Sequence, residues 1–299
     1  MTRVYVLATL VIAGAVSVAA RGYQQPPANA PKVIEVDKVK DNLFVLKGGG
    51  GNTAVFVTSN GVVVVDAKNP GWGQHILEKI KELTNKPVTT LINTHTHGDH
   101  VSGNVEFPAS VDVIVQENTK ANMEKMDIFK ENNNRGMAKK TFTDKMTVGK
   151  GADQIDLYYF GPGHTNGDAW VVFPALRTAH LGDLFASKGL PLVDGNNGGS
   201  VRQYPDTLNK GYNAVKGVDT VINGHNNSTT TWADVKQFAE FNQDFLTWAE
   251  GQLKAGKTPE QAAADWKVPA KYEGYSSQVS QLFGGIAGRI QRLQEEMKK

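Results

Sequence analysis

The sequence predicts a mixed α/β fold with a helical C-terminal extension, and three features support this prediction. First, a strand, a helix and a strand are expected in succession at residues 62–66, 71–83 and 88–92, an order typical of α/β proteins. Second, short runs of β-branched and aromatic residues recur as far as residue 223. Third, beyond Trp232 apolar residues recur at helical spacing and no strand-like segment is present.

The elements expected before Trp232 are strands interspersed with helices. The strand-like segments are residues 33–36, 43–46, 53–57, 62–66, 88–92, 154–160, 169–173, 178–181 and 220–223. The helical segments are residues 71–83, 117–129 and 205–215. Asn60-Gly61 predicts a hairpin turn between two of the strands. Residues 48–51 are four glycines followed by a strand rather than a helix, so a flexible hairpin tip is favoured over a phosphate-binding loop.

Two segments are expected to be irregular. Residues 130–150 carry six basic residues against Glu131 and Asp144. A solvated loop with a surface strand is favoured there over a binding site for an anionic substrate. Residues 186–204 form a long polar loop, and loops of this length in compact domains are more often functional than idle.

The region after Trp232 is predicted to form two or three amphipathic helices. The apolar residues that recur at helical spacing are Val235, Phe238, Phe245, Leu246, Ala249 and Leu253, and then Leu282, Ile286, Ile290, Leu293 and Met297. We expect these stripes to pack against the preceding domain or against a second copy of the chain, which would give a homodimer through the C-terminal helices.

The N-terminus has the pattern of a secretory signal. Arg3 precedes an apolar run from Val4 to Ala20, and cleavage is expected near the small residues that end this run. An uncleaved anchor is the alternative, but the run is marginal for crossing about 30 Å of hydrocarbon. We therefore expect a signal peptide at residues 1–20 and a Pro-rich linker at residues 21–32. The mature protein would be periplasmic or secreted, without stable membrane insertion.

Composition limits the classes of partner. The formal net charge is +2, so no strong overall field attracts nucleic acid, and we expect a small-molecule substrate instead. The chain contains no cysteine, which excludes disulfides and lipid attachment at a thiol. Hydrophobic residues make up 40% of the chain, enough for an ordinary globular core.

Three of the seven histidines fall in one short segment, NTHTHGDH, directly after the strand predicted at residues 88–92. His95 and His97 lie two residues apart, so in an extended segment their side chains point the same way and can bind one metal ion. Asp99 and His100 follow where a second ion could lie. Imidazole and carboxylate ligands together favour zinc or a mixed di-metal centre.

Further candidate ligands stand at the ends of later predicted strands: His164 in GPGHTNGD, Asp183 in HLGDLF and His225 in VINGH. The ordered motifs HxHxDH, GHT, GD and GH resemble the metallo-β-lactamase superfamily. Asp66, which closes the strand VVVVDA, fits the same pattern. The resemblance covers about residues 33–227.

The resemblance implies an αβ/βα four-layer sandwich over residues 33–231, with the site at one edge and the helical extension at residues 232–299. It also implies a role for each matched residue. His95, His97 and His164 would bind the first metal ion, Asp99, His100 and His225 would bind the second, Asp183 would bridge both, and Asp66 would orient a ligand or nearby backbone.

The implied cofactor is a pair of Zn(II) ions, with iron or manganese as alternatives. Such a ligand set leaves open positions for water, as catalytic sites require. A hydroxide held between two ions is a strong nucleophile near neutral pH. Asp99 is the expected proton carrier and Asp183 the bridging group, so these two are the candidate catalytic residues.

Five other residues are singled out outside this set. His180 is expected to be a core histidine, because alternation along its strand points it away from the ligand face. His75 lies in a predicted helix and is interpreted as structural or surface-exposed. Lys188, Asn196 and Asn197 lie in the long polar loop and are candidates for substrate contact, although an ordinary surface role is favoured for the lysine.

The ligand set guides the choice within the superfamily. β-Lactamases with a cysteine ligand have that cysteine in place of Asp183 and usually arginine in place of His100, whereas this set resembles glyoxalases, lactonases and phosphodiesterases. We expect an exported dinuclear-zinc hydrolase that uses a metal-bridging hydroxide to cleave a small-molecule carbonyl bond of the β-lactam or lactone type. A thioester hydrolase like glyoxalase II, or a phosphodiester hydrolase, is the alternative. A non-catalytic metal-binding or interaction protein is the alternative of another class.

Overall fold

The computed structural model describes residues 32–226 and 229–298. The described part of Lys32–Lys299 forms one compact unit. The predicted signal peptide and nearly all of the predicted linker lie outside the described residues, so both stay predictions.

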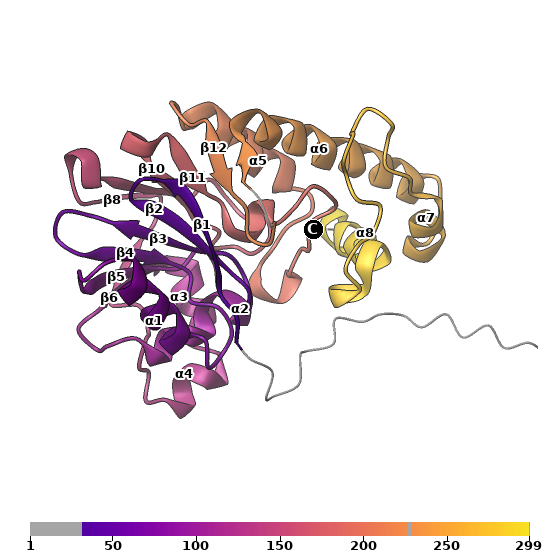
Figure 1. Cartoon of the computed structure of the whole chain (residues 1–299). Helices are drawn as coiled ribbons and strands as arrows, with labels where there is room; N and C mark the ends of the chain where they lie inside the picture. Colours follow the sequence, from indigo (N-terminus) through magenta and orange to yellow (C-terminus); the bar gives the residue numbers. More distant parts are fainter. Residues whose placement is uncertain (1–31, 227–228, 299) are drawn as a thin grey trace, which may run out of the picture. The chain divides into compact units, whose positions relative to one another are not determined.

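The first sheet has seven strands whose spatial order equals their order in the chain (Figure 1). The first four strands are antiparallel and the remaining three add in parallel. They are β1 (Glu35–Lys40), β2 (Leu43–Lys47), β3 (Thr53–Val57), β4 (Val62–Val65), β5 (Val88–Ile92), β6 (Asp112–Gln116) and β7 (Lys140–Phe142). The hairpin turn predicted at Asn60-Gly61 joins β3 to β4, where the Thr58 amide donates to the Gly61 carbonyl at 2.9 Å.

The second sheet has six strands in the order β13-β12-β11-β10-β9-β8. Its one parallel pair, β11 with β12, lies beside antiparallel neighbours on both sides. The bounds are β8 (Lys145–Val148), β9 (Ile155–Tyr158), β10 (Trp170–Phe173), β11 (Thr178–His180), β12 (Thr220–Ile222) and β13 (Thr230–Thr231).

The two sheets pack face to face, and helices cover their outer faces. Along β10, Val171 and Phe173 point into the core between the sheets, whereas Trp170 and Val172 join the core beneath the helices on the other side. This alternation is the period of a strand that is buried on both faces. The structure thus confirms the αβ/βα four-layer sandwich.

The helices of the sandwich begin with α1 (Gly73–Leu83) and α2 (Gly98–Val101), followed by α3 (Glu117–Met123), α4 (Asp127–Glu131) and α5 (Tyr204–Ala214). The single helix predicted at residues 117–129 is wrong, because the chain turns between α3 and α4. Met123 and Phe129 are six residues apart and would point in different directions from one helix. The turn lets both side chains reach the same core, where each is 0% exposed.

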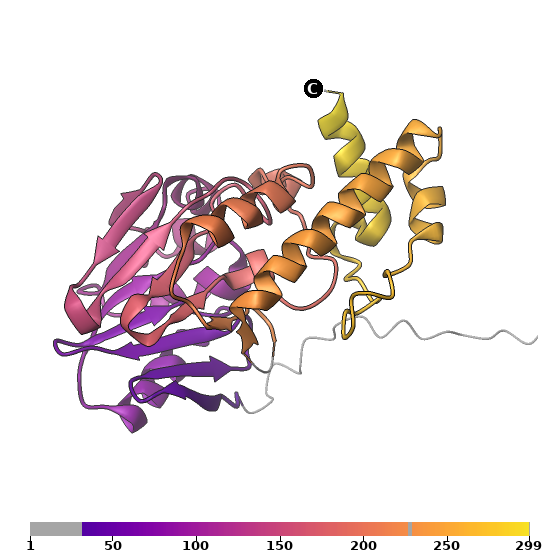
Figure 2. The ribbon, with the colours of Figure 1, turned by 90° about the horizontal axis from the view of Figure 1, so that it is seen from above.

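Three helices form the C-terminal region and lie together to one side of the sheets (Figures 1 and 2). They are α6 (Trp232–Lys254), α7 (Pro259–Asp265) and α8 (Gly285–Met297). The apolar stripe of α6 is buried in the same core as α5 and the second sheet, so it packs against the preceding domain as expected. Leu282 departs from the predicted stripe: positive φ angles at Gly284 and Gly285 start α8 after it, and its side chain is 64% exposed.

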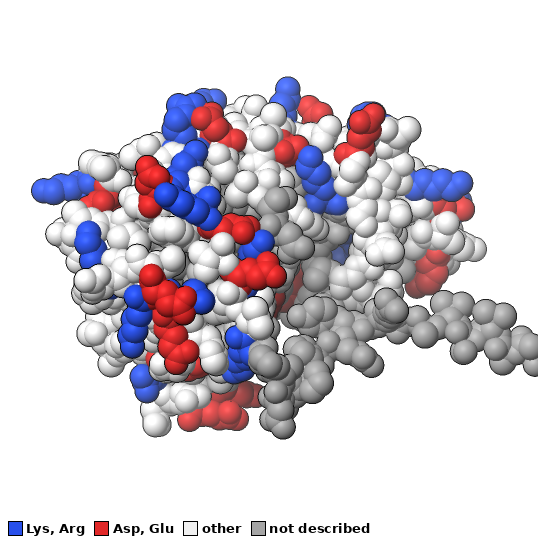
Figure 3. Space-filling view, in the orientation of Figure 1, with Lys and Arg blue, Asp and Glu red and all other residues white. Residues whose placement is uncertain are grey.

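Short 3-10 helices connect several elements: η1 (Ser102–Glu106), η2 (Gly151–Asp153), η3 (Pro174–Leu176), η4 (Gly182–Phe185), η5 (Gly195–Asn197) and η6 (Leu282–Gly284). Within the described ranges, none of the helices combines the length and the hydropathy needed to cross a membrane. Figure 3 shows Lys and Arg side chains interspersed with Asp and Glu side chains over one face of the molecule.

The packing of α5 on β10 makes a matched pair of glycine substitutions informative. A Cβ at Gly211 in α5 would lie 2.3 Å from the buried Trp170 ring, whereas one at Gly251 in α6 would meet nothing within 4 Å. Alanine improves helix propensity at both positions by roughly 0.5–1 kcal/mol, but overpacking costs about 1–3 kcal/mol. We expect Gly211→Ala to lower the free energy of unfolding and Gly251→Ala to raise it, as measured by urea denaturation. Equal effects of the two substitutions would contradict this packing.

Candidate metal centre

The candidate ligands lie where strands of both sheets end. Asp66 follows β4 and His95 lies shortly after β5, and the carboxyl ends of these parallel neighbours share one sheet edge. Asp183 and His225 follow β11 and β12, the parallel pair of the second sheet. His164 lies in the loop between β9 and β10. The topology therefore gathers motifs that are far apart in the sequence.

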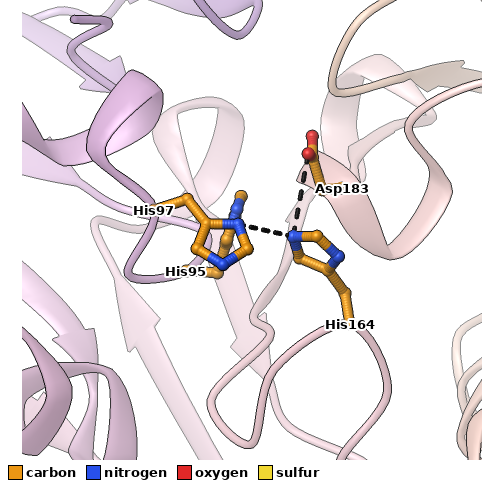
Figure 4. Close-up of side chains that lie close together, drawn as sticks. All are labelled: His95, His97, His164 and Asp183. Carbon is orange, nitrogen blue, oxygen red and sulfur yellow. Dashed lines mark hydrogen bonds and ion pairs between the residues drawn. The ribbon is translucent and has the colours of Figure 1, made fainter. Parts of the chain in front are cut away.

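The first group of potential ligands is His95, His97, His164 and Asp183, whose ligand atoms all lie within 4.8 Å of one another. Figure 4 shows these side chains converging from separate segments. His164 Nε2 lies 2.8 Å from His97 Nδ1 and 3.7 Å from Asp183 Oδ2.

The second group is Asp99, His100 and His225, with ligand atoms equally close together. His225 Nε2 lies 3.2 Å from Asp99 Oδ2 and 3.2 Å from Asp183 Oδ2. The other oxygen of Asp183, Oδ1, lies 3.2 Å from His100 Nε2. Asp183 therefore stands between the two groups, where a bridging ligand would be.

Acceptors outside the cluster determine which way two of the imidazoles face. His100 Nδ1 donates to Asp66 Oδ2 at 2.7 Å, which turns Nε2 toward the cluster. The Thr94 hydroxyl donates to the same carboxylate oxygen at 2.7 Å, so it accepts from His95 Nδ1 at 3.0 Å. The Thr94 amide donates to Asp66 Oδ1 at 2.8 Å. Asp66 thus contacts both the His100 ring and the backbone beside His95, and its role at a metal centre stays a prediction.

The other two imidazoles of the first group are oriented in the same way. His164 Nδ1 donates to the Leu192 carbonyl at 2.9 Å, and His97 Nε2 donates to Asp194 Oδ2 at 2.8 Å. Sequence reasoning missed Asp194, although it lies in the polar loop at residues 186–204 that was expected to be functional. The Asn197 side chain donates to the same Asp194 oxygen at 2.6 Å. Asp194 is therefore a positioning residue, held in turn by Asn197.

Electrostatics divide the two groups. Burial lowers the pKa of His95 well below its usual range and that of His164 to about 4, so both are neutral at neutral pH. Burial also opposes protonation of His225, but the Asp183 and Asp99 carboxylates together outweigh it and raise the pKa to about 9. Burial would raise the pKa of Asp183, yet His225 and His100 hold it well below its usual range. Neutral imidazole and ionised carboxylate are the forms that bind metals, so the first group is already in its binding form, whereas a metal ion at the second group would displace the proton of His225.

The residues fit a divalent metal. His95 Nε2 is buried and has no hydrogen-bond partner among the described residues, which a buried polar atom normally requires. The lone pairs of His97 Nδ1 and His164 Nε2 face it across the first group. A cation shared by these atoms satisfies all of them at once, and imidazole with carboxylate suits zinc, iron or manganese.

The glycine run is a hairpin tip, as predicted, and it packs on the cluster. It joins β2 to β3, and a Cβ at Gly51 would lie 2.1 Å from the His100 ring. Lys68 holds this loop from behind: its ammonium is 0% exposed and donates to the carbonyls of Leu46 at 2.9 Å and Gly51 at 2.7 Å. Burial lowers the pKa of Lys68 to about 7.

The remaining candidates lie as follows. His180 is buried, with Nε2 3.1 Å from the Asn52 carbonyl and Nδ1 accepting from the Gly182 amide, which confirms a core histidine. His75 lies in α1 beside Glu78. Lys188 Nζ lies 2.7 Å from Asp234 Oδ1, so its charge already has a partner. Asn196 contributes its backbone amide to Asp194. Substrate contact by Lys188, Asn196 or Asn197 stays a prediction.

Comparison with known proteins identifies the family. The family model described as the metallo-beta-lactamase superfamily matches residues 46–225, more than half of the chain. The chain belongs to the metallo-beta-lactamase superfamily. This match includes every residue of the two potential metal-binding groups.

Relatives in the superfamily carry different names. A metallo-beta-lactamase type 2 from Elizabethkingia meningoseptica is 32% identical over 157 residues, 47% of this chain and 58% of that protein. A hydroxyacylglutathione hydrolase from Nostoc punctiforme is 28% identical over 186 residues, 60% of this chain and 62% of that protein. The chain thus spans less than two thirds of the length of either relative.

Solved structures share the fold. The superposition on a metallo-beta-lactamase from Pontibacter korlensis has a TM-score of 0.60 at 20% identity. It covers 71% of this chain and 99% of that protein. The superposition on a sec-alkylsulfatase from Pseudomonas sp. has a TM-score of 0.68 at 13% identity. It covers 88% of this chain and 50% of that protein.

Removal of the Asp194 carboxylate tests its positioning role. We expect Asp194→Ala to weaken zinc binding about 10–100-fold, because loss of an orienting hydrogen bond releases the His97 ring. Asn197→Ala should have a smaller effect. Asn196→Ala is the matched control and should bind as the wild type does, because only its backbone contacts Asp194. Competition with a chelating dye measures each affinity, and unchanged binding by Asp194→Ala would refute the role.

The buried charge of Lys68 predicts a pH dependence of stability. Its folded pKa of about 7 lies below the usual lysine value of 10.5, so between these values the unfolded chain binds more protons and stability rises with pH. We compare the chelator-treated wild type with Lys68→Met. Between about pH 7.5 and 9, the free energy of unfolding should increase by about 1–2 kcal/mol more in the wild type than in the variant. Lys86 also donates to two backbone carbonyls but is exposed, so Lys86→Met should retain the wild-type slope. Parallel curves for wild type and Lys68→Met would contradict the prediction.

Proposed function

We propose that this protein is an exported metal-dependent hydrolase that holds two zinc ions and cleaves a small-molecule carbonyl bond of the β-lactam or lactone type. The main observation behind this proposal is the set of inward-facing ring nitrogens. His95, His97, His164 and His100 each have one ring nitrogen held from outside, and the other faces the cluster around Asp183. A structural site would need only a closed set of four ligands, whereas two adjoining groups leave positions for water and substrate.

The metal pair would supply a hydroxide nucleophile near neutral pH and polarise the scissile carbonyl. The chain's own residues would position that chemistry. Asp183 joins the two groups, and Asp66 and Asp194 fix the ring orientations.

Asp99 is the candidate to accept and return a proton. Its side chain is 32% exposed, and Oδ2 lies 3.2 Å from His225 Nε2. Burial would raise the pKa of Asp99, but His100 and His225 together outweigh it and lower the pKa to about 2, which keeps the carboxylate ionised.

A thioester hydrolase is the second candidate function. The chain has Asp183 and His100 at the positions where the cysteine-ligand β-lactamases have cysteine and usually arginine. In addition, one relative is named a hydroxyacylglutathione hydrolase. A phosphodiester substrate remains the third choice, and a non-catalytic metal-binding protein is the alternative of another class. All four possibilities make different predictions for one substrate panel.

Hydrolysis by the zinc-loaded protein is to be measured on a chromogenic cephalosporin, a lactone, a thioester and an aryl phosphodiester. We expect the largest kcat/KM on a carbonyl substrate. Asp183→Ala should lower it at least about 10³-fold, because it removes the group shared by both metal-binding groups. Lys188→Ala is the matched control. Because the Lys188 ammonium is paired with Asp234, the kcat of this variant should stay within about twofold of the wild-type value. A raised KM of this variant would show substrate contact by Lys188.

The outcomes separate the candidates. Faster turnover of the thioester or of the phosphodiester would replace the proposed substrate and keep the metal centre. Two bound zinc ions without turnover of any compound would support the non-catalytic protein. Full activity of Asp183→Ala with full metal content would refute the bridging role.

A further inference from the structure

An exposed phenylalanine lies beside the candidate metal centre, and the residue before it is an exposed leucine. Among the described residues three large hydrophobic side chains are strongly exposed: Leu282 at 64%, Phe283 at 47% and Val33 at 64%. The Phe283 ring stacks on the ring of His97, with centroids 6.3 Å apart and planes inclined by 26°. An exposed apolar pair that adjoins a functional site is typical of a binding surface.

The backbone of Phe283 adopts a conformation that bulky residues rarely take. Its φ of 55° and ψ of 28° lie in the left-handed region. At Gly288 a Cβ would lie 1.8 Å from the Phe283 carbonyl oxygen, so glycine at this position permits the first turn of α8 to pack under the segment. Such strained positions persist where the surroundings hold them, and they cluster at ligand-binding sites.

Helix α8 anchors this segment to the loop that orients His97. The buried Arg289 guanidinium donates to the Pro191 carbonyl at 2.7 Å. Glu296 accepts from the Ser200 hydroxyl at 2.9 Å. Both partners lie in the loop that carries Asp194, so one helix fixes the exposed apolar pair and the metal centre together.

We propose that Leu282 and Phe283 form an apolar wall of the substrate site, which binds an alkyl or aryl substituent next to the scissile carbonyl. This inference rests on the proposed function. Because the Phe283 ring stacks directly on a ligand of the metal centre, the group that it covers must lie close to the bond that is cleaved. The substrate class is thereby narrowed to carbonyl compounds with an apolar substituent at that position, and a polar substituent would gain nothing from this wall.

A homologous series of substrates tests the wall. For zinc-loaded wild type, kcat/KM on γ-lactones with alkyl substituents from methyl to hexyl should rise about twofold per methylene, roughly half the effect of full burial because the wall covers one side. Phe283→Ala should flatten this rise, and Phe283→Leu should restore most of it. Leu176→Ala is the matched control, because it also removes an apolar side chain. The loop of His164 precedes β10, whereas Leu176 follows the other end of this strand.

A binding measurement decides the proposal without turnover. Calorimetric titration with straight-chain carboxylates from propanoate to octanoate should show affinity that increases with chain length in wild type and in Leu176→Ala, but not in Phe283→Ala. Zinc content and thermal unfolding confirm that each variant is folded and loaded. If no lactone is hydrolysed, the proposed function fails for lactones, while the carboxylate series still tests the wall.

Two results would overturn the inference. One is an unchanged dependence on chain length in Phe283→Ala, in both the rates and the affinities. The other is a dimeric wild type that becomes monomeric in Phe283→Ala without any change in chain-length dependence, which would assign the exposed pair to an interface between two copies of the chain.

Discussion

Repulsion among closely spaced lone pairs and carboxylates is the constraint on which the rest of the structure depends. Two groups of ligand atoms, each within 4.8 Å, meet at Asp183. Such an arrangement is unfavourable unless protons or cations occupy it, and it persists only because the surroundings over-determine it. Thr94, Asp66, Asp194 and the Leu192 carbonyl each hold one imidazole from outside. The two sheets contribute by ending their parallel strands at this edge.

Much of this arrangement could be predicted because it is encoded locally. Strands β3 and β5 occupy the predicted residues, since each is a short β-branched run with a clear end. The ligand residues follow such strands within short motifs, so position and chemistry are read together. The helix expected at residues 117–129 failed for the opposite reason: periodicity describes one helix, whereas the core requires both Met123 and Phe129.

The outer partners were missed because their roles arise from distant parts of the chain. Asp194 is an ordinary loop aspartate until folding brings it to His97, 97 residues away in sequence. Lys68 has the composition of a surface lysine, and only the burial of its ammonium beneath the glycine hairpin distinguishes it. Leu282 fits a helical apolar stripe in sequence, but the glycines that follow place it and Phe283 outside α8. Single-sequence patterns carry no signal for such pairings.

The anchoring of the Asp194 loop by α8 has a consequence for the order in which the molecule is completed. Ser200 and its partner Glu296 are 96 residues apart, so during synthesis the loop emerges well before the helix that holds it. All seven candidate ligands precede α8 in the chain. A chain that contains every candidate ligand but not α8 therefore still lacks the helix that holds the loop of Asp194, and we expect firm metal binding to require α8 as well.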